Sequence, residues 1–165
     1  MQRFYTQKMD TTKLRLSGLM ELIWWIMTAL VVVVILFPVF ENVPEYPFWT
    51  YNILYITLFI TYTRYIFHLK HTWLARLFWL KIIFIFTSIP VTFLLIEGIN
   101  SFQVYLDEVG INDFLGHLSN VQQQSLATYI RTEMIFFGTA AVIGSILWPI
   151  RLIISIWRVR NRGTV

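Results

Sequence analysis

The chain has 165 residues, of which 57% are hydrophobic and 13% are charged, and its mean hydropathy is +0.63. Soluble domains carry about 25% charged residues, so this composition excludes an ordinary soluble protein and predicts an integral membrane protein. Because there is no cysteine, disulfides, thiol catalysis, iron–sulfur clusters and thiolate-bound zinc are excluded. The net charge of +4 comes from short basic blocks beside apolar runs. Such blocks are typical of membrane proteins, in which they set the orientation of the spans, and they do not indicate nucleic-acid binding.

Residues 1–18 are predicted to form a cytoplasmic segment, since they carry four basic residues and one acid. The first membrane span is expected at 19–40, because about 20 apolar residues cross a hydrocarbon core of roughly 30 Å as a helix. Pro38, Pro44 and Pro47 are expected to end this helix and to force an extended outer connection. The apolar run is long and lacks small residues after it, so no cleaved signal peptide is expected.

The second and third spans are expected at 47–67 and 73–96, joined by a short basic loop. So short a connection makes these two spans antiparallel neighbours. Lys81 lies inside the third span, and its charge must snorkel to the inner interface or meet an acid within the bundle.

Residues 97–127 form the one sizeable polar segment, which contains acids but no lysine or arginine and is therefore predicted to lie outside. Its apolar residues after 101 recur at helical spacing, which predicts a short amphipathic helix on the outer membrane surface or over the end of the bundle. Gly110 is expected to end that helix. The last span is expected at 128–157, within a helix that begins near a possible capping box at Ser119, and the cytoplasmic tail follows at 158–165.

The charges fall unequally on the two sides of this arrangement. With both termini inside, twelve of the thirteen lysines and arginines lie on the inner side, and seven of the nine acids lie outside. The expected fold is therefore all-α, a polytopic membrane protein with four transmembrane helices and an extracytoplasmic amphipathic insertion between helices 3 and 4. The expected location is the plasma membrane, in a bacterium the inner membrane.

Charged residues near the span ends are candidates for structural ion pairs. They are Glu21, Arg64, Arg76 and Lys81 at the inner end, and Glu97, Arg131 and Glu133 at the outer end. An unpaired charge at such a depth costs several kcal/mol, so Glu21 is expected to pair with one of the inner bases, and Arg131 to form a clamp with Glu97. The functional alternatives are a proton or ion relay at Glu21, a lipid-headgroup site, and a gate or substrate-binding group at the outer end.

Small residues cluster on the last predicted span. Gly138, Ala141 and Ser145 share one helical face with Gly144 beside it, and such spacing lets another helix approach closely. This face is expected to pack against a partner.

No catalytic, cofactor or metal site is predicted. His68 and His71 are expected to be interfacial polar residues, because zinc or haem would need further ligands that the nearby sequence does not supply, and His117 has no evident partner. The sequence has no phosphate loop, metalloprotease helix or nucleophile elbow.

These features favour a non-catalytic subunit of a larger membrane assembly, in contact with lipid and with other membrane subunits or further copies of itself. The alternative is a small homo-oligomeric channel or transporter whose path is lined by polar residues of the second span. These are Asn52, Thr57, Thr61, Tyr62 and Thr63. A third hypothesis is a membrane enzyme that acts on lipid through the basic inner face.

Overall fold

The computed structural model describes residues 2–162, and it describes the side chains of residues 18–161 except those of residues 71, 73 and 76. The regular structure of the described range is entirely helical, which confirms the all-α prediction. The helices are α1 (Gln2–Asn42), α2 (Trp49–His68), α3 (Phe78–Glu108), α4 (Asn112–Leu115) and α5 (Asn120–Arg162), with two 3₁₀ turns at Leu69–His71 and Trp73–Arg76.

Three stretches of the described chain are long and apolar enough to cross a membrane. They are Gly18–Asn42 of α1, Phe78–Glu108 of α3 and Asn120–Asn161 of α5. α2 has 20 residues, enough for a crossing, but its asparagine, threonines and tyrosines make it less apolar than the other three. The fold is thus that of a membrane protein with three candidate spans.

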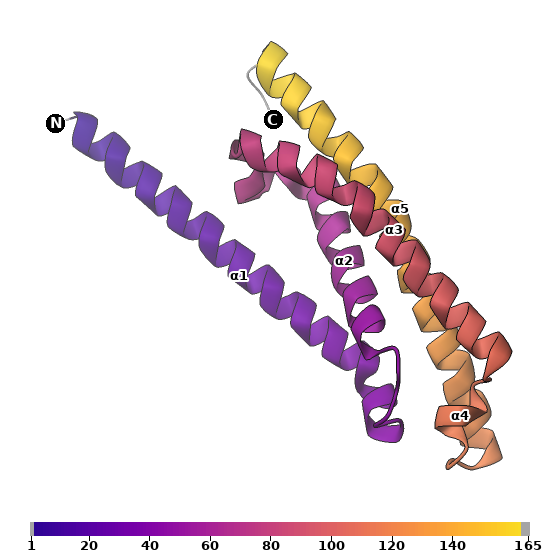
Figure 1. Cartoon of the computed structure of the whole chain (residues 1–165). Coiled ribbons are helices and arrows are strands. Elements are labelled where there is room, and N and C mark those ends of the chain that lie inside the picture. Colours follow the sequence, from indigo (N-terminus) through magenta and orange to yellow (C-terminus); the bar gives the residue numbers. More distant parts are fainter. Residues whose placement is uncertain (1, 163–165) are drawn as a thin grey trace.

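The helices form a packed group and one divergent arm (Figure 1). α5 packs against both α3 and α2, whereas α1 contacts mainly α2. α1 lies close to α2 where the two are joined and diverges from the other helices toward its N-terminus. We call the end of the molecule that carries α4 the α4 end, and the opposite end, with the 3₁₀ turns between α2 and α3, the hairpin end.

Aromatic side chains fill the core at both ends. At the α4 end, Phe48 packs edge-on against Phe102, with ring centroids 5.2 Å apart, and Tyr46 packs against Phe114 at 5.5 Å. Near the hairpin end, Tyr62 lies 5.1 Å from the ring of Trp148. The segment around α4 therefore covers the end of the packed helices with its own apolar side chains.

Helix α1 continues through Pro38 to Asn42, contrary to the prediction that this proline ends it. A proline lacks the N–H that would bond the carbonyl four residues before it, here that of Val34, so Pro38 removes a single bond of the helix, which continues for one more turn. At the end of α1 the Asn42 side chain donates back to the carbonyl of Pro38 over 2.7 Å.

Helix α3 runs unbroken past Glu97, the start of the predicted outer segment, to Glu108. The amphipathic stretch expected as a separate helix is the last part of α3. Gly110 then stops the helix with a φ of +88°, a conformation that glycine adopts without strain. α5 begins at Asn120, directly after Ser119, whose hydroxyl donates to the Gln122 side chain over 2.7 Å. Its 43 residues extend about 64 Å.

Candidate functional sites

An ion pair joins α1 to α2. The Glu21 carboxylate lies 2.7 Å from the Arg64 guanidinium, and the two side chains are only 13% and 9% exposed. Arg64 also lies over the ring of Trp24, 5.2 Å from its centroid, which adds a cation–π contact from α1. Glu21 and Arg64 thus bridge the two helices at a point where α1 has begun to leave the bundle. The side chain of Arg76 lies outside the described part of the chain.

Lys81 is held by neutral acceptors. Its side chain is 2% exposed, and its ammonium donates to the carbonyl of Ala75 over 2.6 Å and to the hydroxyl of Ser155 over 3.0 Å. Among the described side chains no acid pairs with it, so it neither snorkels out nor meets the acid that the sequence analysis allowed. One turn before Ser155 on α5, Arg151 donates from Nε to the carbonyl of Ile66 over 3.0 Å. These contacts tie the start of α3 and the end of α2 to α5.

At the α4 end the carboxylate of Glu133 is buried between α5 and α2. Its side chain is 6% exposed, and Asn52, which is fully buried, donates from Nδ2 to Oε2 over 2.8 Å. The second carboxylate oxygen of Glu133 and the amide oxygen of Asn52 are buried and accept no hydrogen bond. No basic residue pairs with Glu133 among the side chains that the structure describes.

Tyr46, from the connection between α1 and α2, completes this site. Its side chain is 3% exposed, and its hydroxyl is buried without a hydrogen-bond partner. Burial and the negative charge of Glu133 raise the pKa of Tyr46 well above its usual value, while the adjacent Asn52 side chain acts in the opposite direction. Tyr46, Asn52 and Glu133 therefore meet from three separate segments, and we call them the Glu133 cluster.

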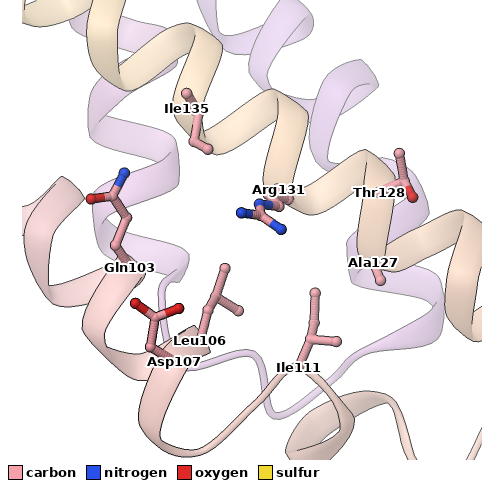
Figure 2. Close-up of a pocket in the computed structure, with 8 residues that line it drawn as sticks. All are labelled: Gln103, Leu106, Asp107, Ile111, Ala127, Thr128, Arg131 and Ile135. Carbon is pink, nitrogen blue, oxygen red and sulfur yellow. The ribbon is translucent and has the colours of Figure 1, made fainter.

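Arg131 points into a hollow between α3 and α5 and makes no ion pair with Glu97 in the described part of the chain (Figure 2). The hollow has a volume of about 350 Å³. Its lining consists of Gln103, Leu106, Asp107, Ile111, Ala127, Thr128, Arg131 and Ile135. The guanidinium faces the side of α3 that carries Gln103 and Asp107, two to three turns beyond Glu97. The clamp expected at the outer end is therefore not formed with Glu97.

The small-residue face of α5 is covered by the chain itself. A Cβ added at Gly144 would lie 2.9 Å from the Cβ of Tyr62, and one added at Gly138 would lie 3.0 Å from the side chain of Ile99. Ser145 shares a hydrogen bond of 2.8 Å with Thr92 of α3, and Ala141 is fully buried. Close packing occurs as expected, but it is against α2 and α3, so this face is not free for a partner subunit.

Two of the three histidines, His68 and His117, have described side chains. His117, for which the sequence predicts no partner, lies with Nε2 2.8 Å from the carbonyl oxygen of Asn42 and so joins the α4 segment to the end of α1. The side chain of His71 lies outside the described residues. Elsewhere in the described chain, no three histidine or acidic side chains are grouped so that they could hold a metal ion.

The Glu133 cluster is not predicted from the sequence, although two of its members are candidate residues there. Glu133 was expected in an outer charged group and Asn52 on a channel path, and Tyr46 had no predicted role. The available signal was Asn52, the one amide side chain of α2, together with Glu133, an acid within a predicted span that has no base three or four residues away. Comparison with known protein families, with curated proteins and with solved structures finds no match for this chain.

Proposed function

We propose that this chain is a non-catalytic subunit of a larger membrane assembly and that a transmembrane helix of a partner subunit packs between α1 and α2. The position of α1, which diverges from the other helices, carries this proposal (Figure 1). Large apolar side chains remain exposed on successive turns of α1. They include Leu19, Leu22, Ile26, Leu30, Val33, Val34, Phe37 and Phe40. A helix that is apolar all round is covered by lipid or by other helices.

An apolar groove of about 630 Å³ lies between α1 and α2. Its lining is made of Val32, Val33, Leu36, Phe37, Phe40, Pro44, Trp49 and Ile53. Helix partners commonly dock in such grooves through apolar side chains one turn apart. Because the small-residue face of α5 is already covered, this groove is the surface that best supports a contact with another subunit.

The proposed topology has four crossings with both termini in the cytoplasm of a plasma membrane. Its support is geometric, since α1 ends at the α4 end whereas α3 begins at the hairpin end. If α1 and α3 both cross, α2 must cross between them. The buried Asn52, Tyr55 and Tyr62 of α2 face protein and not lipid, which explains how a less apolar helix is tolerated there. The acids near the α4 end and the bases near the hairpin end agree with this orientation.

The absence of native cysteine makes the proposal testable by cross-linking in native membranes. Single cysteines at Phe40 and Ile53, in the groove, are expected to give an adduct of one defined mass with a different membrane protein. Phe86 and Phe93 are matched controls, because they are 68% and 67% exposed on α3 away from the groove. The proposal would be contradicted if all four positions gave the same yield of protein adducts, or if the cysteines cross-linked only to lipid.

A small homo-oligomeric channel or transporter is the second candidate, and the buried, unpaired Glu133 favours it, because ionisable groups within membrane helices commonly mark transport pathways. The same cross-linking distinguishes the two candidates. Adducts whose mass equals two copies of this chain would favour the channel or transporter, and native mass determination would then give the number of copies.

A further inference from the structure

We propose that the Glu133 cluster is a binding site for a small monovalent cation such as sodium. The inference does not rest on the proposed subunit function. It starts from the burial of the three side chains, Tyr46, Asn52 and Glu133, which are 3%, 0% and 6% exposed. Each of them presents an oxygen that is buried and makes no hydrogen bond, namely Tyr46 Oη, Asn52 Oδ1 and Glu133 Oε1.

The charge of Glu133 requires compensation. A carboxylate removed from water is strongly destabilised unless it is paired, and one hydrogen bond of 2.8 Å from Asn52 satisfies only one of its two oxygens. Arg131, the nearest base along α5, is directed into the hollow between α3 and α5. Within the described chain, no other cation replaces it.

The chemistry of the unsatisfied oxygens indicates the ligand. Carboxylate, amide and hydroxyl oxygens are the donors that hard cations prefer. The cluster contributes a single negative charge, so a monovalent ion neutralises it, whereas a divalent ion would leave a buried excess of positive charge. Because Tyr46, Asn52 and Glu133 come from the α1–α2 connection, α2 and α5, a bound ion would also hold these three segments together.

Thermal unfolding of the purified full chain in nanodiscs tests the site, with sodium chloride compared against choline chloride at equal ionic strength and fixed pH. Sodium is expected to raise the Tm in a saturable way, since an ion that binds the folded state stabilises it by mass action. Glu133→Gln should fold, because its amide oxygen can still accept from Asn52, and it should lose the sodium effect. Tyr46→Phe keeps the ring and is expected to weaken the apparent affinity about 10-fold.

Glu97→Gln is the matched control, since Glu97 is exposed on α3, and it should respond to sodium as the unmodified chain does. Equal stabilisation by sodium and choline would overturn the proposal, because it would reflect ionic strength alone. A sodium effect that survives in Glu133→Gln would overturn it as well. A third result would also overturn the proposal, namely no sodium effect in the unmodified chain together with a Glu133→Gln variant that is more stable than it. Glu133 would then be a buried carboxyl group without a ligand. Sodium-22 binding by equilibrium dialysis checks the same affinities without relying on stability.

Discussion

At the residue scale, the contact between Glu21 and Arg64 is the interaction whose removal has the clearest consequence. Glu21→Gln leaves the Arg64 guanidinium without its counter-charge at a site where it is 9% exposed, so we expect a loss of about 3 kcal/mol in the free energy of unfolding. Denaturation in detergent micelles, followed by tryptophan fluorescence, measures this loss, and Trp24 beside Arg64 reports on the site.

A double-mutant cycle provides the control for that prediction. The variant in which Glu21 and Arg64 are both glutamine removes both charges and should lose less stability than the sum of the two single variants. Strict additivity would show that the two side chains do not interact. Glu97→Gln, at an exposed position on α3, should change stability by no more than about 0.5 kcal/mol.

The sequence predicts the depth of a charged side chain in the membrane but not which residues surround it. Glu21 and three bases lie at similar depth, and helix rotation, which the sequence does not specify, decided that Arg64 meets the acid. Lys81 found carbonyl and hydroxyl acceptors instead of an acid, because the 3₁₀ turns bring the Ala75 carbonyl back over the start of α3. Such backbone acceptors carry no signature in the sequence.

At the scale of elements, the close approach of α5 to α2 depends on Gly144. A methyl group there would press on the Cβ of Tyr62, which cannot swing away as a side-chain tip can. Gly144→Ala should therefore lower the free energy of unfolding by about 1–3 kcal/mol despite the better helix propensity of alanine.

Gly18→Ala is the matched control, because Gly18 is also helical but has no neighbouring atom within 4 Å. The same unfolding assay should find Gly18→Ala unchanged or more stable, and an equal effect at both glycines would contradict the packing.

The glycine and serine signals predicted helix ends well, whereas Pro38 and a change in hydropathy did not. Gly110 stops α3, and α5 starts beside Ser119, both as expected. The helix continues through the change from apolar to polar residues at Glu97, where nothing breaks it, so the predicted amphipathic helix is part of α3. The spacing of the small residues on α5 correctly predicts a packing face. Periodicity does not say which helices cover that face, and here they are α2 and α3 of the same chain.

At the scale of the whole molecule, the number of crossings decides on which side each end lies. With four crossings and the N-terminus inside, as proposed, the hairpin end is cytoplasmic and the α4 end is outside. If α2 did not cross while the N-terminus stayed inside, the two assignments would be reversed. Single cysteines at Lys70 and Ser119 distinguish these arrangements in intact cells with a membrane-impermeant maleimide, because the chain has no native cysteine. We expect Ser119→Cys to react at once and Lys70→Cys to react only after permeabilisation. The opposite pattern would contradict the proposed topology, since it requires either four crossings with both termini outside or three crossings. Three crossings with the N-terminus inside would also place Asn42 and His117 on opposite sides of the membrane, although the His117 Nε2 lies 2.8 Å from the carbonyl oxygen of Asn42.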